Sequence, residues 1–301
     1  MLENLIGRGQ NGSEGREKVG LGSIRRPVIG LALGGGAARG LAHIPMLEVF
    51  DEMGIKPAVI AGCSFGALIG AAYASGIPAK EIGDHARHIL ANRVQAAKYL
   101  FGVKRARIGD LLKRKSFTSL LVDGEQLTGF IFPEGVATRV EDTQIPLKIV
   151  TTDFLERREH VISSGPMCQA VAASIAIPGL ISAPTIDGRL YVDGGITNPV
   201  PFDHVRVGTD LVVAIDVTGR QREPRRGHHS NMELAIGSML IMFHQIAQLR
   251  RAVSPPDIYI EPPVGAFSAL EFFRAEEMIA AASTSKDQLK RALELRLKAA
   301  G

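Results

Sequence analysis

The sequence of 301 residues is long enough for one large α/β domain or two smaller domains. Hydrophobic residues make up 46% of it and charged residues 22%, a balance that excludes global disorder. The two cysteines, Cys63 and Cys168, are too few for a disulfide framework or a four-ligand zinc site, and they fit a reducing compartment. The formal net charge of +4 permits weak attraction to an anionic surface but is poor evidence for nucleic-acid binding, so we expect no nucleic-acid partner.

Residues 1–26 are polar, glycine-rich and without periodicity, which predicts a flexible leader. They contain no apolar core of a signal peptide, and no later apolar run approaches the ~20 residues of a membrane span. We therefore expect a cytoplasmic protein, with peripheral membrane contact as an open alternative. No internal repeat or domain boundary is visible after the leader, so residues 27–301 are predicted to form one domain.

The first elements after the leader alternate between strands and helices. Residues 27–33 form a continuous apolar run, typical of a strand buried on both faces, and a glycine turn and a helical pattern over about 39–53 follow it. Residues 58–62 repeat the buried-strand pattern, and 64–75 repeat the helical one. This alternation predicts a parallel sheet with right-handed crossovers.

The later elements are a mixture of helices and short strands. A Ser268/Glu271 pair has the spacing of a capping box, which predicts a helical segment from there to about residue 300. The remaining predictions are helices with polar breaks over 80–132, strands over 145–154, 159–163, 189–192, 211–217 and 257–260, and helices over 167–175 and 231–253.

The segment Gly62-Cys63-Ser64-Phe65-Gly66 has the pattern G-x-S-x-G between a predicted strand and a predicted helix. A sharp strand-to-helix turn of this kind exposes the serine hydroxyl at the edge of the sheet, and the helix N-terminus favours developing negative charge. The alternative is a glycine-tight turn with a capping serine. The strand–turn–helix context favours Ser64 as a nucleophile.

A second glycine-rich segment, Gly34-Gly35-Gly36-Ala37-Ala38-Arg39-Gly40, follows the first strand. Successive glycines let several backbone N–H groups point into one concavity at the start of a helix, which makes an anion site. The dinucleotide fingerprint fails because Arg39 stands where its third glycine belongs, and the Lys-Ser/Thr of a Walker loop is absent. An oxyanion hole is the favoured interpretation over a plain tight turn.

The third segment is Asp193-Gly194-Gly195, which follows the predicted strand at 189–192. An aspartate at a strand end before two glycines lies where another segment of backbone can approach closely. By itself the pattern is weak, since Asp-Gly is also a common hairpin turn.

Together these three segments resemble the patatin-like phospholipase family, and the closest likeness is to its compact bacterial single-domain members. The resemblance extends over most of the chain after residue 27, and the order and spacing of the segments are specific. It implies a three-layer α/β/α sandwich with a central, mostly parallel sheet. Further matching segments are Thr152-Asp153, Ala173-Ser174-Ile175-Ala176-Ile177-Pro178 and Asn198-Pro199-Val200-Pro201.

The resemblance also implies a serine lipid acyl hydrolase of the phospholipase A, lysophospholipase or esterase type. Ser64 would be the nucleophile and Asp193 the base, and the N–H groups of Gly35, Gly36 and Ala37 would form the oxyanion hole. Arg39 would support that loop or attract a lipid phosphate. The chain departs from the plant-type loop at Ala37, which replaces a glycine and tolerates fewer backbone conformations. The motif glycines are Gly34, Gly40, Gly62, Gly66, Gly194 and Gly195.

Two rival functions remain open from the sequence. A Ser-His-Asp triad requires one of the histidines after Asp193, and none is flanked as a hydrolase histidine loop would be. The second rival function is that of a binding or regulatory protein with an inactive dyad, although all the dyad residues are present. The histidines that qualify by order are His204, His228, His229 and His244.

The expected ligands are a phospholipid or lysophospholipid, with no cofactor and no metal, since neither metal-ligand spacing nor a calcium loop is found. The oligomeric state is left open. Residues 231–253 are expected to be mostly core, with an acyl channel or a dimer contact as alternatives, and Cys168 is expected to be buried. A basic cluster is interpreted as a solvated face or a headgroup-attracting surface; it consists of Lys104, Arg105, Arg107, Lys113, Arg114 and Lys115.

Overall fold

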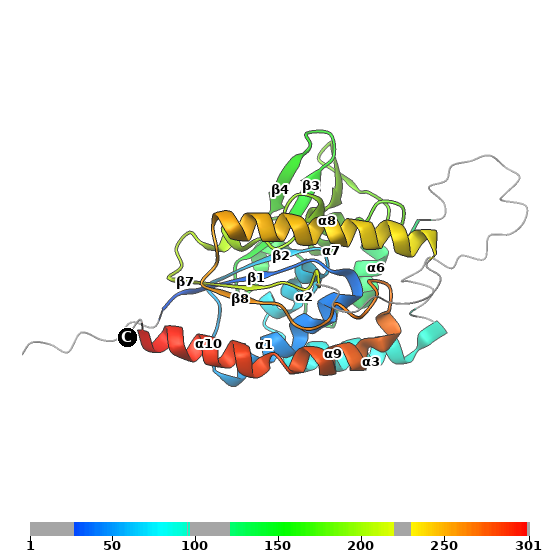
Figure 1. Ribbon diagram of the computed structural model, residues 1–301. Helices are drawn as coiled ribbons and strands as arrows, with labels where there is room; N and C mark the ends of the chain where they lie inside the picture. Colours follow the sequence, from blue (N-terminus) through cyan, green and yellow to red (C-terminus); the bar gives the residue numbers. More distant parts are fainter. Residues whose placement is uncertain (1–26, 95, 97–120, 220–229, 300–301) are drawn as a thin grey trace, which may run out of the picture.

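The structure is a computed structural model that describes residues 27–94, 96, 121–219 and 230–299. The predicted leader at 1–26 and the basic cluster at 104–115 lie outside the described residues. The fold is built on an eight-stranded sheet in the order β5-β6-β3-β2-β1-β7-β8, with β4 paired to β3 (Figure 1). Its strands are β1 (Ile29–Leu33), β2 (Val59–Cys63), β3 (Leu147–Asp153), β4 (Arg158–Ile162), β5 (Thr185–Ile186), β6 (Arg189–Asp193), β7 (Leu211–Ile215) and β8 (Ile258–Ile260).

The sheet is mostly parallel, as predicted. Strands β3, β2, β1, β7 and β8 are parallel neighbours, whereas β4 and β6 run antiparallel to β3. In this register Cys63 lies opposite Val150 and Asp193 lies opposite Thr151, and β4 pairs with both of these β3 residues from the other side. Strands β2 and β6 therefore meet end to end along one edge of β3. The residue after Cys63 and the last residue of β6 are thereby brought to the same edge of the sheet.

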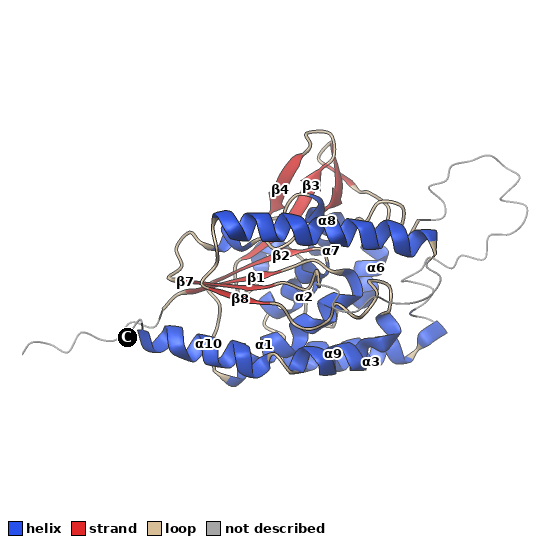
Figure 2. Cartoon of the chain, viewed as in Figure 1, coloured by secondary structure: helices blue, strands red, loops and turns tan. Residues whose placement is uncertain are grey.

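Helices cover both faces of the sheet, which confirms the three-layer architecture (Figures 1 and 2). The larger core includes Leu31, Leu33 and Ile60 of the strands, Phe50 of α1 and Leu289 of α10. On the opposite face, a smaller core joins the sheet to η5 and α8. The α-helices are α1 (His43–Glu52), α2 (Phe65–Ala74), α3 (Ala79–Ala91), α6 (Gly124–Ile131), α7 (Met167–Ser174), α8 (Asn231–Val253), α9 (Ala275–Ser283) and α10 (Lys286–Ala299), and the 3-10 helices are η1 (Ala37–Ala42), η3 (Val140–Asp142), η4 (Gly194–Ile196), η5 (Phe202–Val205) and η6 (Phe272–Arg274).

Two helix starts differ from their predictions. The helical pattern at 39–53 begins as the 3-10 helix η1 and becomes α-helical at His43. The Glu271 carboxylate accepts the N–H of Ser268 at 2.7 Å, but the chain then turns through η6, and α9 begins only at Ala275. Within the described residues, a capping box is instead formed by Ser230 with Glu233 at the start of α8.

Helix α8 is also more exposed than its sequence predicts. Instead of being mostly core, it buries Ile236, Leu240, Phe243 and Ala247 alone. Over the described part of the chain, α8 is the one helix that meets the length and apolar composition of a membrane span. The expectation that no apolar run approaches the length of a membrane span is therefore wrong for α8, judged by length and composition. Core helices of soluble proteins meet the same measure.

Candidate active site

The turn between β2 and α2 places Ser64 in a strained backbone conformation, with φ of 51° and ψ of −124°. The flanking glycines are required by packing: a Cβ on Gly62 would lie 2.6 Å from the Ala67 Cα, and one on Gly66 would lie 2.2 Å from the Leu33 carbonyl oxygen. The Ser64 side chain makes no capping hydrogen bond to α2, which excludes the alternative of a capping serine. Its hydroxyl is left for another partner.

That partner is Asp193. The Ser64 hydroxyl donates to Asp193 Oδ2 at 2.7 Å, and both side chains are buried. The second carboxylate oxygen, Oδ1, accepts the N–H of Gly195 at 2.8 Å. The Asp-Gly pair forms no hairpin turn but leads into η4, and a Cβ on Gly194 would lie 2.1 Å from the Val150 carbonyl oxygen. Gly194 thus allows β6 to end against β3 and fixes the carboxylate.

Burial raises the pKa of Asp193 to about 6, although the hydrogen bonds from Ser64 and Gly195 favour the charged form. At neutral pH the carboxylate is ionised and more basic than an exposed aspartate. It can therefore accept a proton from a hydroxyl in contact with it.

Ser174, to which the resemblance assigns no role, also holds this site together. The Ser174 hydroxyl accepts the N–H of Ser64 at 2.8 Å and donates to the Val150 carbonyl at 2.6 Å. It fixes the strained turn to β3 from the end of α7. The sequence signal was the serine within Ala173-Ser174-Ile175-Ala176-Ile177-Pro178, a segment that the resemblance included without giving the serine a role.

One of the three oxyanion-hole donors predicted in the glycine-rich loop is wrong. The Gly35 N–H donates to the Pro199 carbonyl at 2.9 Å, so it does not face a ligand. Within the described residues, no acceptor is recorded for the N–H groups of Gly36 and Ala37. These two residues line one hollow together with Ser64 and Asp193. Ala37 adopts a φ of 49°, a left-handed conformation that strains an alanine.

Two buried side chains support this loop. Arg39 donates from Nε to the Phe267 carbonyl at 2.8 Å and from Nη1 to the Thr218 carbonyl. Burial lowers its pKa to about 10, which keeps it charged at neutral pH. His43 lies 2.7 Å from the Gly34 carbonyl through Nε2, and burial lowers its pKa to about 4, so the neutral ring donates this bond. Arg39 has the contacts expected of loop support.

Comparison with known proteins places the chain in a family. The patatin-like phospholipase family model matches residues 31–206, which include the glycine-rich loop, the Ser64 turn and Asp193. The chain belongs to the patatin-like phospholipase family. This confirms the resemblance stated from the motifs.

The patatin-like chain is similar to named proteins from bacteria and fungi. It is 31% identical to an NTE family protein of Mycobacterium bovis over 68% of this chain and 53% of the relative. It is 25% identical to a lysophospholipase NTE1 of Pyricularia oryzae over 83% of this chain and 18% of the relative. The chain therefore spans about half of the mycobacterial protein and under a fifth of the fungal one.

Two solved structures are similar to the patatin-like chain at low identity. VipD from Legionella pneumophila is 15% identical with a TM-score of 0.49, over 88% of this chain and 67% of that one. The type III effector ExoU is 18% identical with a TM-score of 0.41, over 91% of this chain and 54% of that one.

Of the histidines after Asp193 in this patatin-like chain, the two within the described residues have partners other than Ser64. His204 is paired with Glu159, and His244 lies 3.1 Å from the Thr218 hydroxyl through Nδ1. His228 and His229 lie outside the described residues. Within the described residues, the recorded partner of the Ser64 hydroxyl is a carboxylate and not an imidazole.

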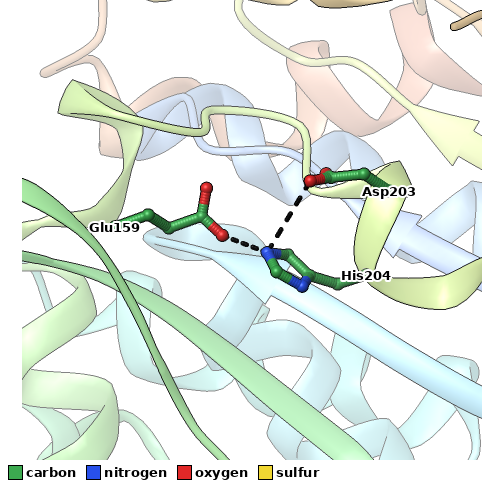
Figure 3. A group of neighbouring side chains, drawn as sticks. All are labelled: Glu159, Asp203 and His204. Atoms are coloured by element: carbon green, nitrogen blue, oxygen red, sulfur yellow. Dashed lines mark hydrogen bonds and ion pairs between the residues drawn. The ribbon is translucent and has the colours of Figure 1, made fainter.

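Folding gathers two clusters of acidic and histidine side chains that no sequence spacing indicated. Figure 3 shows the first, formed by Glu159, Asp203 and His204. Both of its carboxylates also accept hydrogen bonds from Arg250 of α8 at 3.1 Å. The second cluster is Asp216, His244 and Glu261, in which Asp216 accepts from Thr218 and from Tyr259. Protein donors thus occupy the carboxylates of Glu159, Asp203 and Asp216.

The two cysteines differ in accessibility, and we expect one of them to react in the native protein. Burial, with the nearby Asp193 carboxylate, raises the pKa of Cys63 well above its ordinary value. Cys168 is partly exposed rather than buried, although burial raises its pKa as well. Titration with a disulfide reagent should find one reactive thiol in the folded protein and two after denaturation, and Cys168→Ser should remove the first. Two fast thiols in the folded state would contradict this assignment.

Proposed function

We propose that this chain is a serine lipid acyl hydrolase that cleaves carboxylic esters of phospholipids or lysophospholipids. The observation that carries the proposal is the 2.7 Å hydrogen bond from the Ser64 hydroxyl to the buried Asp193 carboxylate, at a strained strand-to-helix turn. Membership of the patatin-like phospholipase family and the likeness to proteins named lysophospholipases support a lipid as the substrate.

In this mechanism Ser64 attacks the ester carbonyl while Asp193 accepts its proton. The N–H groups of Gly36 and Ala37 donate to the oxyanion of the tetrahedral intermediate, which collapses as the alcohol or lysolipid leaves with the proton from Asp193. Asp193 then removes a proton from water as the water oxygen attacks the acyl carbonyl. The bond to Ser64 breaks, Asp193 returns the proton to the Ser64 oxygen, and the fatty acid is released. The raised pKa of Asp193 makes the carboxylate a better proton acceptor for both half-reactions.

We also propose that the catalytic domain extends over 27–301, beyond the part matched by the family model. Met278 of α9 and Leu289 and Leu293 of α10 are fully buried in the same core as β1 and β2. Helix α8 supplies side chains to the hollow that Ser64 and Asp193 line. Removal of these helices would expose both the core and the dyad.

The test is release of fatty acid from mixed micelles of phosphatidylcholine and lysophosphatidylcholine with EDTA present. The wild-type protein should release fatty acid, Ser64→Ala should release none, and His204→Gln and His244→Gln should retain activity. The preferred lipid would then indicate the substrate. Loss of activity in a folded histidine variant would favour the triad instead. A wild-type protein inactive on every lipid would favour a regulatory function.

The rate should depend on pH through the ionisation of Asp193. Protonated Asp193 cannot accept the Ser64 proton, so kcat/KM should fall about tenfold for each pH unit below about 6 and level off above 7. The measurement is hydrolysis of a soluble, non-titrating ester between about pH 4.5 and 8, since the carboxylate is the titrating base in that window. His204→Gln should give the same profile. A rate that stays flat through this range would contradict the role of Asp193.

A further inference from the structure

The dyad lies beneath α8, and the way in is closed. Ser64 is 3% exposed and Asp193 is fully buried. Four residues of α8 line the hollow above them: Ile236, Met239, Leu240 and Phe243. The space left is about 10 Å³, roughly the room for one water molecule and too small for an acylated glycerol. A lipid ester can reach Ser64 only if this hollow widens, and α8 supplies four of the nine residues that line it.

The packing of α8 permits such a movement. Above the dyad, Ile236, Leu240 and Phe243 belong to a small apolar cluster with Ala37, Ile177 and Ala269, separate from the main core. Nearer its C-terminal end, α8 is fastened to the body by Arg250, which bonds to Glu159 and Asp203. The part of α8 over the dyad is thus held by apolar contacts, whereas the part near its C-terminal end is held by ion pairs.

None of the exposed residues of α8 is charged. Its charged side chains are engaged: Glu233 in the capping box, Arg250 with Glu159 and Asp203, and Arg251 with Glu261. Its exposed residues are Asn231, Met232, Leu234, Ala235, Ser238, Ile241, Met242, Gln245, Leu249, Ala252 and Val253.

Helix α10, below the sheet in Figure 1, has the opposite character. Its exposed residues include Asp287, Lys290, Arg291, Glu294, Arg296 and Lys298, the usual outward face of a surface helix. A face as long as that of α8 without a charge is unusual for a surface that stays in water, and it marks a contact site.

We propose that the outer face of α8 docks on a phospholipid surface and that docking draws α8 away from the dyad. This inference rests on the proposed function, because a lipid hydrolase meets its substrate at such a surface. The coupling follows from the two faces of the helix. In water, opening would expose Ile236, Leu240 and Phe243, whereas at a lipid surface these side chains enter the acyl region beside the outer ones. The lipid surface therefore binds the open form more tightly than the closed one.

A second copy of the chain is the less favoured occupant. Two α8 helices packed against each other would bury the same outer residues, but they would leave the inner residues in place over Ser64. A lipid surface accounts for both the uncharged outer face and the closed dyad.

The first experiment measures binding without catalysis. Ser64→Ala protein is mixed with vesicles of equal parts ether-linked phosphatidylcholine and phosphatidylglycerol, and bound protein is quantified by flotation. On this background we compare the triple variant Ile241→Gln, Met242→Gln and Leu249→Gln with the control Leu295→Gln. The three side chains are 65%, 55% and 68% exposed, and Leu295 of α10 is 70% exposed. Glutamine is a good helix former, so the helix is retained.

We expect Ser64→Ala protein to bind, the control to bind equally, and the triple variant to lose about tenfold or more in the partition coefficient. Equal binding by the triple variant, or no binding by the parent, would overturn the proposal. A parent that elutes as a dimer, together with a monomeric triple variant, would assign the face to a second copy instead. None of these outcomes depends on ester hydrolysis, so a failure here is distinct from a failure of the proposed function.

The second experiment measures opening. A small soluble fluorophosphonate should label Ser64 of the protein with its native dyad slowly in water and about tenfold faster when the ether-lipid vesicles are added. The same triple variant with Ser64 retained should label slowly in both conditions. A labelling rate that vesicles do not change, in protein that binds them, would overturn the coupling between docking and opening.

Discussion

Asp193→Asn should lower kcat roughly 10³-fold, the range lost when a positioned general base is removed, and should also make the folded protein more stable at neutral pH. Asparagine is nearly isosteric: its oxygen can still accept the Gly195 N–H, and its amide can donate to Ser64. It cannot take the proton of Ser64. Activity is therefore lost without loss of the fold.

The stability gain follows from the sign of the pKa shift. The folded pKa of Asp193 is about 6, above the ordinary value of 3.8, so the folded state binds the proton more tightly than the unfolded state. Its stabilising contribution is present below about pH 4 and is lost as the pH rises through about 6, a change of about 3 kcal/mol. The substituted asparagine does not titrate. Between pH 4 and 7, the free energy of unfolding of the variant in urea should therefore rise relative to that of the wild type by about the same amount.

Asp153→Asn is the matched control at the end of β3. There, hydrogen bonds from the Glu156 and Leu155 N–H groups, with Arg189 nearby, hold the pKa of the carboxyl below its usual value. Its replacement should retain activity and reduce stability at neutral pH, the opposite of Asp193→Asn. If Asp193→Asn were active, or unstable at pH 7, Asp193 would be a structural residue rather than the base.

Gly66→Ala should destabilise the protein by about 3 kcal/mol or more and abolish hydrolysis. The added Cβ would lie 2.2 Å from the Leu33 carbonyl oxygen and 2.6 Å from that of Gly34, both of them backbone atoms that no rotamer change can move. To relieve the contact, α2 must shift away from β1, and Ser64 shifts with it. The Cm of urea unfolding and the rate of ester hydrolysis measure the two effects.

Gly70→Ala, one turn later in α2, is the control for this prediction. A Cβ there would meet the side chains of Ile60 and Leu33 at 3.4 Å, an ordinary packing distance. Alanine is also the better helix former, by about 1 kcal/mol. This variant should therefore be as stable as the wild type or more so, and active. Equal damage from both substitutions would show that α2 tolerates no added methyl group, independently of the turn.

The elements and site features that sequence predicted are those set by local chemistry. Apolar runs gave β1, β2 and β7 to within two residues, and the glycine spacing located the strained turn at Ser64. The placement of Asp193 beside Ser64 required the family resemblance, because the two residues are distant in the chain and Asp-Gly alone also fits a hairpin.

The features that could not be predicted from the sequence depend on contacts between distant segments. The loss of the Gly35 donor comes from Pro199, and the support of Ser64 comes from Ser174. The exposure of α8 was missed because an apolar composition is the same whether a helix lies in a core or on a surface. In each case the missing information was the identity of the neighbour, which local periodicity does not encode.

The alignment of both members of the dyad along one edge of β3 limits which changes in chain length this fold can tolerate. Cys63 and Asp193 are opposite consecutive residues of that strand, Val150 and Thr151. One residue inserted or deleted within β3 would slip the pairing and turn the side chains to the other face of the sheet. Additions to the connection between α3 and β3 leave this register unchanged, and lengthening a loop costs little closure entropy. Divergence in length within this fold should therefore accumulate in connections and spare the strand that aligns the serine turn with Asp193.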